Sequence, residues 1–484
     1  MDDSSSIKNL PNEVLARIFS TVTNRRQTPW KLPLPVLLSS VCRHWRMLAE
    51  NTPELWINIV VPMDKSLEDC TNWTAEWIAR SGILLISVFI DIGAFGMGCR
   101  RAHLINITSL LSRHSERLRR LVLHCSDYCL ESPQSVLDSV FSQLKSAPNL
   151  QELIFRSQIC SPRWIRAANS SHREYSLDFP RLTTLKIEGS IPPIYNLTSL
   201  TIGKLHATYK AVSLIFTTSP GLQHLALCDL IPLATTPPQD TALIRADSLR
   251  SLAVNMYWAH RPGGDIHTFK YLAMPNINYL ELDGDRWSIS DFGQSLFSAK
   301  IDTLRISNCF EESFDADTID FFHSFSTLRH LQLVNTSTRL LSKIIGPRSL
   351  ARKTSIDSHN SSSSNRPTTP IDVDNIIAIQ QKQSVLASVW PELRIISLDT
   401  LKAADVLNLC NFVTCHKLVE VVELSMSARR HLSLSLHRKD DIVYECPSLS
   451  VDAGSEEGLN DVEEWLGKMV DIREHFRVGL LNDD

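Results

Sequence analysis

The sequence predicts a mixed α/β solenoid, in which a small all-helical segment is followed by an irregular, curved array of parallel strands and helices. Apolar side chains of the first sixty residues recur at helical spacing. From Leu118 onward the pattern Leu-x-x-Leu-x-Leu returns, with Ile, Val or Phe replacing some of the leucines. A chain of 484 residues is too long for one compact core, so it must divide into domains or extend as an array.

The first helix is predicted from two apolar pairs at i and i+4, Val14 with Ile18 and Leu15 with Phe19. Pro11 suits the first turn, where the amide that proline lacks would have no partner in any case. A second helix should carry one apolar face made of Leu38, Cys42, Trp45 and Ala49. Two such short helices cannot bury their apolar faces alone, so they need a partner or a larger domain around them.

Three motifs follow one another here: Leu-Pro-x-Glu from Leu10, Val-Cys-Arg-x-Trp from Val41 and Pro-x-Leu-Trp from Pro53. In this order they resemble the F-box, through which substrate receptors dock on the Skp-type adaptor of cullin-RING ubiquitin ligases. The alternative is an ordinary helical hairpin at the start of a larger domain. The connection from Thr23 to Pro35 is longer than in compact versions of the box, which leaves the geometry between the first helices open.

The resemblance implies a set of adaptor-facing or core residues, with Trp56 packing the box onto the chain that follows. Glu13 would also lie near the positive end of the first helix dipole. The residues expected to bind the adaptor are Leu10, Pro11, Glu13, Leu15, Ile18, Val41, Cys42 and Trp45.

Each repeat of the leucine pattern predicts one strand, whose fourth and sixth residues point into a shared core. Most repeats begin 24 to 32 residues apart, close to the period of leucine-rich repeats, whereas the steps of 15 before Leu197 and 65 before Leu393 are irregular. The segments are 118–123, 150–155, 182–187, 197–202, 222–227, 249–254, 277–282, 301–306, 328–333 and, more weakly, 393–398 and 418–423. Together with the box they resemble the F-box and leucine-rich-repeat class in the form common in fungi.

The third and fifth residues of each repeat should point to the opposite, open face of the strands, where a protein target would bind. Their charges are mixed in sign, which favours no charge class of target. The candidate target-binding residues are Arg120, Glu152, Lys186, His224, Tyr279, Glu281, Arg305 and His330.

The predicted domains are the box at 1–60, a linking segment with the first strand and helix units at 61–117, the solenoid at 118–445 and an acidic C-terminal segment at 446–484. Residues 349–370 are rich in Ser and poor in apolar side chains, which predicts a disordered insertion. A helix over 456–476 is expected to cap the end of the array, because the last repeat would otherwise expose its core.

Charge and cysteines indicate protein partners in the cytoplasm or the nucleus. The formal net charge of −4 gives no electrostatic reason to expect a nucleic acid or a membrane surface. Eleven cysteines, an odd number without framework spacing, and an acidic N-terminus favour reduced thiols. The clusters Cys125 with Cys129, and Cys410 with Cys415 and His416, lack the paired spacing of a zinc site, so neither metal nor cofactor is expected.

No catalytic motif stands out, because the sequence has no G-x-S-x-G, no phosphate-binding loop followed by Lys and no H-E-x-x-H. The chain is therefore expected to be a non-catalytic substrate receptor of a Skp-cullin-F-box ubiquitin ligase. A scaffold that binds the adaptor outside any ligase is the alternative. An enzyme would need a deep polar pocket with perturbed titratable groups.

Overall fold

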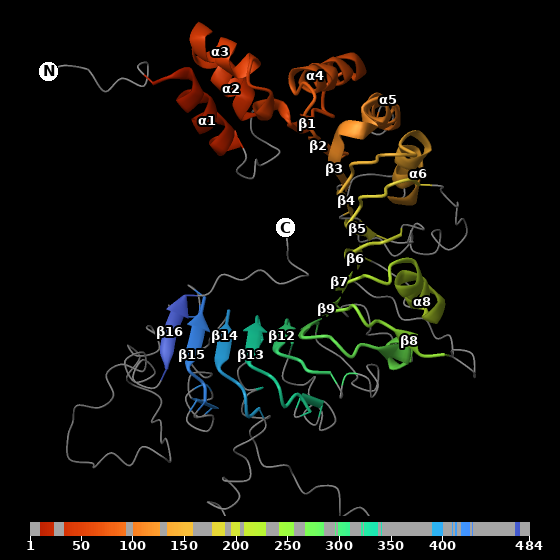
Figure 1. Cartoon of the computed structure of the whole chain (residues 1–484), viewed down its shortest axis with the longest axis vertical. Coiled ribbons are helices and arrows are strands. Elements are labelled where there is room, and N and C mark those ends of the chain that lie inside the picture. Colours follow the sequence, from red (N-terminus) through yellow and green to blue (C-terminus); the bar gives the residue numbers. More distant parts are fainter. Residues whose placement is uncertain are drawn as a thin grey trace, which may run out of the picture. The chain divides into compact units, whose positions relative to one another are not determined.

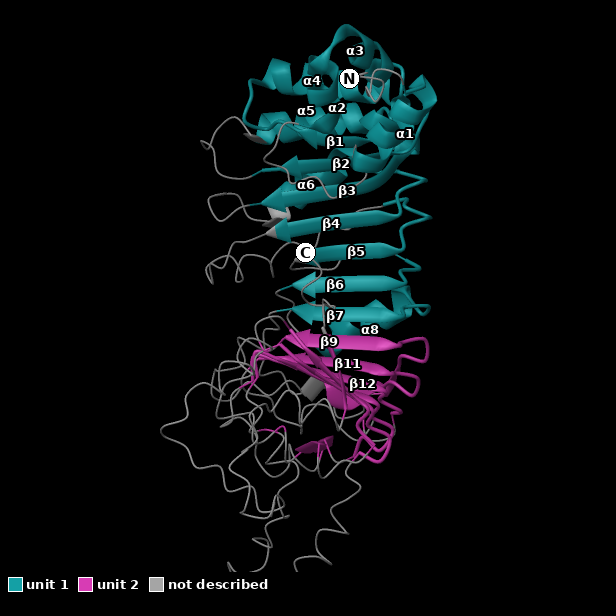
Figure 2. Ribbon diagram, turned by 90° about the vertical axis from the view of Figure 1, so that its left-hand side faces the viewer, with its two compact units in different colours: residues 1–228 teal, residues 229–484 magenta. Residues whose placement is uncertain are grey.

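A computed structural model divides the chain into two compact units, Met1–Cys228 and Asp229–Asp484, which Figure 2 colours separately. The described residues are 10–23, 33–92, 100–125, 133–157, 177–188, 195–203, 208–228, 242–255, 267–284, 296, 299–309, 321–322, 324–336, 340, 390–399, 409, 412–413, 418–425, 428 and 470–474. The predicted insertion at 349–370 lies outside them, and the predicted domain boundaries stay predictions.

The first unit begins with three α-helices and a 3-10 turn. These are α1 (Asn12–Thr23), α2 (Leu34–Val41), α3 (Arg43–Glu50) and η2 (Pro53–Trp56). The single helix predicted through Cys42 is wrong, because Cys42 is extended at φ −159° and ψ 169° and divides α2 from α3. Its Sγ accepts a hydrogen bond from the Trp45 amide at 3.4 Å, so the residue caps the N-terminus of α3.

A parallel sheet follows, in which each strand pairs with its sequence neighbour (Figure 2). Its strands are β1 (Asn58–Val61), β2 (Ile86–Asp91), β3 (Leu118–Cys125), β4 (Glu152–Ser157), β5 (Thr184–Glu188), β6 (Ser199–Gly203) and β7 (His224–Cys228). One face is covered by α4 (Leu67–Arg80), α5 (Arg100–Ser112), α6 (Pro133–Gln143) and α8 (Tyr209–Thr218), with the turn η3 (Ser115–Arg117) before β3 (Figure 1). This order and the parallel pairing confirm the predicted solenoid-like architecture.

The strands of the second unit are also parallel and follow sequence order. Its strands are β9 (Ser251–Asn255), β11 (Tyr279–Asp283), β12 (Thr303–Ser307), β13 (His330–Val334), β14 (Ile395–Leu398), β15 (Val421–Leu424) and β16 (Asp471–Glu474). The turn η5 (His267–Tyr271) leads into β10 (Leu272–Ala273), which pairs with β8 (Ile244–Arg245) in a separate two-stranded sheet.

The capping helix predicted over 456–476 is wrong at its end, where β16 adds a strand to the sheet. Val470 is buried just before it, and Asp471 to Glu474 pair in parallel register with Val421 to Leu424. The open edge of β15 offers backbone donors and acceptors that a strand satisfies and a helix does not.

The core of each unit is the leucine ladder that the repeats predict. Every predicted repeat contains a strand, and residues four and six are buried from Leu121 and Leu123 in β3 to Leu280 and Leu282 in β11. In the second unit a second ladder runs along the strand ends, where the side-chain amides of Asn255 and Asn308 donate to Asp283, both at 2.6 Å. Leucine stacking and this polar ladder together fix the register of neighbouring strands.

Among the described residues, no helix combines the length and the apolar character that crossing a bilayer requires.

Candidate functional site

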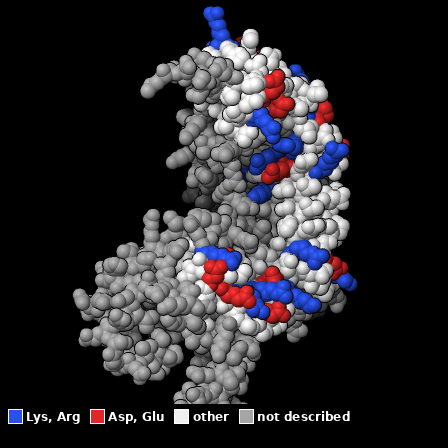
Figure 3. All heavy atoms as spheres, turned by 60° about the vertical axis from the view of Figure 1, so that its left-hand side comes forward, with Lys and Arg blue, Asp and Glu red and all other residues white. Residues whose placement is uncertain are grey.

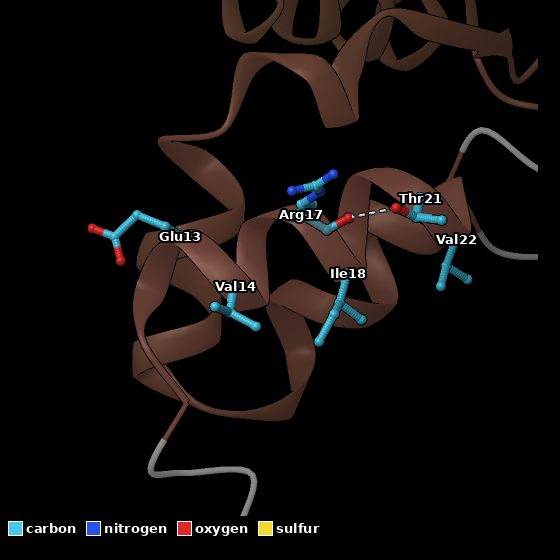
Figure 4. A pocket seen from close by; sticks show the side chains of 6 residues that line it. All are labelled: Glu13, Val14, Arg17, Ile18, Thr21 and Val22. Atoms are coloured by element: carbon cyan, nitrogen blue, oxygen red, sulfur yellow. Dashed lines mark hydrogen bonds between the residues drawn. The ribbon is translucent and has the colours of Figure 1, made fainter.

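Helix α1 has two apolar faces that point in different directions. Leu15 and Phe19 are buried, whereas Val14, Ile18 and Val22 are 43%, 42% and 48% exposed. The sequence predicted one stripe from both pairs, and the structure separates it into a core face and a face open to solvent. The three open side chains lie at successive i+4 positions along the helix (Figure 4).

This open face borders a shallow hollow of about 560 Å³, lined by Glu13, Val14, Arg17, Ile18, Thr21 and Val22. Thr21 donates its hydroxyl to the Arg17 carbonyl at 2.8 Å, which satisfies that hydroxyl within the helix (Figure 4). Glu13 and Arg17 form no ion pair with any described residue. The hollow is therefore an apolar row with one anionic and one cationic side chain beside it.

The other two box helices also leave apolar residues open. Leu37 and Val41 are exposed at i and i+4 on α2, and Met47 is exposed on α3. Seven of the twelve large hydrophobic side chains that are exposed among the described residues lie between Leu10 and Met47. Single exposed apolar residues are ordinary on a protein surface, whereas such a concentration is typical of an interaction site.

The predicted adaptor-binding residues differ in their exposure to solvent. Leu10, Pro11, Glu13, Ile18, Val41 and Cys42 are exposed. Trp45 is half-buried, its ring 4.8 Å from that of Phe19. Leu15 is fully buried, so of the two roles that the resemblance allowed, core or adaptor-facing, the structure gives it the core role. Three exposed residues were not singled out from the sequence: Val22, Leu37 and Met47.

Trp56 joins the box helices to the first repeat unit. Its Nε1 donates to the Ala49 carbonyl at 2.8 Å, and its ring meets that of Trp77 on α4 edge to face at 5.0 Å. The Arg80 guanidinium lies 4.5 Å from the Trp56 ring centre and 3.8 Å from the Glu50 carboxylate. Trp56 is itself buried, so the packing role expected of it agrees with these contacts.

Arg117, the last residue of η3, strengthens the same region. Its guanidinium donates to the carbonyls of Leu84 and Ile78 and, at 2.5 Å, to the hydroxyl of Ser81 at the end of α4. Burial lowers the pKa of Arg117 from its ordinary value, although Glu116 acts in the opposite direction. The side chain therefore serves as a cap for α4 and fixes that helix on the sheet.

In the first unit, the predicted target residues lie on the strand face opposite the helices. Arg120 is exposed and pairs with Glu152 on β4 at 2.6 Å. Lys186 and His224 are half-buried. These side chains are partly accessible, as a binding face requires.

In the second unit, the prediction fails for three of four target residues. Tyr279 is half-buried, but Glu281, Arg305 and His330 are buried. The physical reason is a row of polar side chains at matching register on successive strands, which hydrogen-bond to one another instead of facing solvent.

The buried polar row runs across β11 to β15. Arg305 Nε lies 3.2 Å from Glu281 Oε1, and Arg305 Nη1 donates to Gln332 Oε1 at 3.3 Å. The row continues through His330 Nε2, which is 2.6 Å from Ser397 Oγ, and Ser397 donates to Glu423 Oε2 at 2.6 Å.

The row contains a serine, a histidine and a glutamate, the residue types of a catalytic triad. Their geometry does not match that of a triad. The Ser397 hydroxyl and the Glu423 carboxylate both approach Nε2 of His330, at 2.6 and 3.7 Å. In a triad the carboxylate orients the histidine through the other ring nitrogen, while the serine proton goes to the histidine. Here the serine proton goes to the carboxylate, so the row is structural.

Among the described residues, no group of three or more His, Cys, Asp or Glu could hold a metal ion. Cys125 is buried, and its predicted neighbour Cys129 lies outside these residues, as do Cys410, Cys415 and His416.

Comparison with known proteins finds one family match over part of the chain. Residues 7–62 match the F-box-like family, which covers the box helices and β1 and leaves out the strands from β2 onward. No curated protein matches the chain. A crystal structure of a Bacteroides fragilis protein, a structural-genomics target, is 11% identical over 74% of each chain with a TM-score of 0.29, too low to assign a fold or a function.

Proposed function

We propose that this chain is the substrate-recognition subunit of a Skp-cullin-F-box ubiquitin ligase. Its box helices bind the Skp-type adaptor, and its leucine-rich strand array binds a protein target. The observation that carries the proposal is the concentration of exposed apolar side chains on α1, α2 and α3, within the segment that matches the F-box-like family. F-box domains generally bind adaptors of this type, and an apolar surface of this kind is stabilised when a partner covers it.

The mechanism is proximity, and the chain itself contributes no chemical step. An adaptor held on the box and a target held on the strands would belong to one complex, which raises the concentration of the target near the ubiquitin-transfer centre. The complex would act in the cytoplasm or the nucleus, with proteins as its only partners and no bound metal or cofactor.

The docking test replaces one exposed side chain on the box and one equally exposed side chain elsewhere. Ile18→Asp places a carboxylate on the open face of α1, whereas Leu214→Asp does the same on α8, where the exposed fraction is 40% against 42% for Ile18. Since a buried unpaired charge at an interface is strongly unfavourable, Ile18→Asp should weaken binding of a purified Skp-type adaptor by about 30-fold or more.

Leu214→Asp should bind the adaptor like the unchanged chain. Titration by calorimetry measures both affinities, and circular dichroism confirms that both variants fold. Equal affinity of the Ile18→Asp variant and the unchanged chain would contradict the docking proposal.

A scaffold that holds the adaptor outside any ligase is the second candidate. Both candidates place the adaptor on the same exposed face, so they differ in the larger complex. Co-purification of the chain with adaptor and cullin separates them, because the ligase requires all three proteins together and the scaffold retains the adaptor alone.

A further inference from the structure

The polar side chains on the two strand faces are not equally open, although the repeat pattern is the same in both. In the first unit, the third residues of the repeats in β3 to β7 are exposed or half-buried, from Arg120 to His224, and so are the polar fifth residues Lys186 and Thr201. In the second unit, the third residues Tyr279 and Thr303 are half-buried, but the fifth residues Glu281, Arg305, Gln332 and Ser397 are all buried in the polar row. A target can therefore reach the first face and not this row of the second.

The burial removes one carboxylate and one guanidinium, Glu281 and Arg305, from any surface that a target could touch, so it does not change the net charge of that face. The charged residues of strands β3 to β7, by contrast, are mainly cationic. By sequence, these strands contain the basic residues Arg119, Arg120, Arg156 and Lys186 and the acidic residues Glu152 and Glu188.

The cationic side chains share one part of the face. Arg119 reaches across to Ser87 on β2, with Nη2 3.3 Å from the hydroxyl, at the register position next to Arg120. Lys186 pairs in register with Ile154, and Arg120 with Glu152, so three neighbouring strands carry these groups. Figure 3 shows Lys and Arg spheres in the upper part of the molecule, with acidic spheres among them.

Neutral polar groups complete the face. Thr184, Ser199 and Thr201 are half-buried on β5 and β6, and His224 is half-buried on β7. Hydroxyl and imidazole groups donate hydrogen bonds to carboxylates without adding a competing negative charge. The whole chain is acidic at −4, so the excess of cations is a local property of this face.

We infer that the target-binding surface is the open face of β3 to β7, and that it binds an acidic segment of a protein. This rests on the proposed function and adds to it the location of the site and the charge class of the target. Arg120 and Lys186 carry the recognition, while Glu281, Arg305 and His330 hold the second unit together and do not touch the target.

The test selects peptides from a random 12-residue display library on the full chain. Selected peptides are expected to be rich in Asp and Glu and to bind the double variant Arg120→Gln with Lys186→Gln about fivefold or more weakly, since each partly exposed ion pair contributes up to about 1 kcal/mol. The matched control is Lys145→Gln with Lys210→Gln, which neutralises two exposed lysines off this face and should leave peptide binding unchanged.

Neutralisation is chosen so that no new like-charge pair forms beside Glu152, and unchanged thermal unfolding confirms that both double variants fold. The inference would be overturned if the selection gave no peptides, or if the selected peptides were not rich in Asp and Glu. It would also be overturned if the selected peptides bound both double variants equally. Tighter binding of a single-stranded 20-nucleotide RNA than of the selected peptides would overturn it as well, since that would make the cationic face a nucleic-acid site.

Adaptor affinity is measured on the same two double variants and should not change. Adaptor binding by the Ile18→Asp variant tests the proposed function, whereas peptide binding by the strand variants tests the inference. The proposed function and the inference can therefore fail separately.

Discussion

Replacing Trp56 by Phe should loosen the box from the first repeat unit. The substitution keeps an aromatic ring beside Trp77 but removes the indole N–H that donates to the Ala49 carbonyl at 2.8 Å. The Ala49 carbonyl keeps the Thr52 amide as a donor at 3.3 Å, so loss of the indole bond costs about 1–1.5 kcal/mol, and the weaker attraction of the Arg80 guanidinium for a phenyl ring adds about 0.5 kcal/mol. The expected total is about 2 kcal/mol.

Two measurements follow from this magnitude. The unfolding temperature of the first unit should fall by about 4–8 °C, the range for a unit of this size. Amide hydrogens of α2 and α3 should exchange about 30-fold faster, because every 1.4 kcal/mol is a factor of ten.

Trp73→Phe is the matched control on the same aromatic cluster. The Trp73 ring lies 5.7 Å from that of Trp77, but its Nε1 is buried with no hydrogen-bond partner among the described residues. Removing a donor of that kind should be neutral or slightly stabilising. If both substitutions lowered the unfolding temperature equally, the hydrogen bond of Trp56 would not be what couples the box to α4.

Three further outcomes are expected. Leu15→Ala should destabilise the box by about 2–5 kcal/mol in thermal unfolding, since Leu15 is fully buried. Arg305→Met should destabilise the second unit by about 3–5 kcal/mol in urea, because it leaves Glu281 buried without its cation, while Met at both positions should be nearly neutral. At pH 8 iodoacetamide should label exposed Cys42, and bound adaptor should protect it. Cys70 should stay unlabelled until unfolding, since burial foremost, and Asp64, raise its thiol pKa to about 11.

The sequence predicts the strands well because period-two burial and leucine stacking act over a few residues. Every repeat from Leu118 to Glu423 contains a strand, including the repeat after the short step before Leu197. The break at Cys42 was not predictable in the same way, because cysteine is not among the residues that favour helix N-caps. Strand β16 was missed since no repeat motif precedes it.

The candidate sites were predicted less completely, because exposure depends on neighbours far away in the sequence. Val14 and Leu15 are adjacent and equally apolar, yet one is open to solvent and the other is core. Glu152 and Glu281 are the third and fifth residues of their repeats, positions that the pattern assigns to the open face, yet Glu152 is half-buried and Glu281 is buried beside Arg305. Residue type and spacing give the set of candidates, and the three-dimensional neighbours select among them.

Both proposed binding surfaces lie within Met1–Cys228, which has a physical consequence for the ligase model. The open face of α1 and the strands β3 to β7 are joined through Trp56, Trp77 and Arg117, each held by specific contacts rather than by a free linker. A linker would let a bound target sample many positions, whereas packing of this kind restricts it to few. The position of the acidic segment in the target would then largely decide which target lysines come near the ubiquitin-transfer centre. A lysine at the wrong distance from that segment should therefore be modified slowly, even when the target is bound tightly.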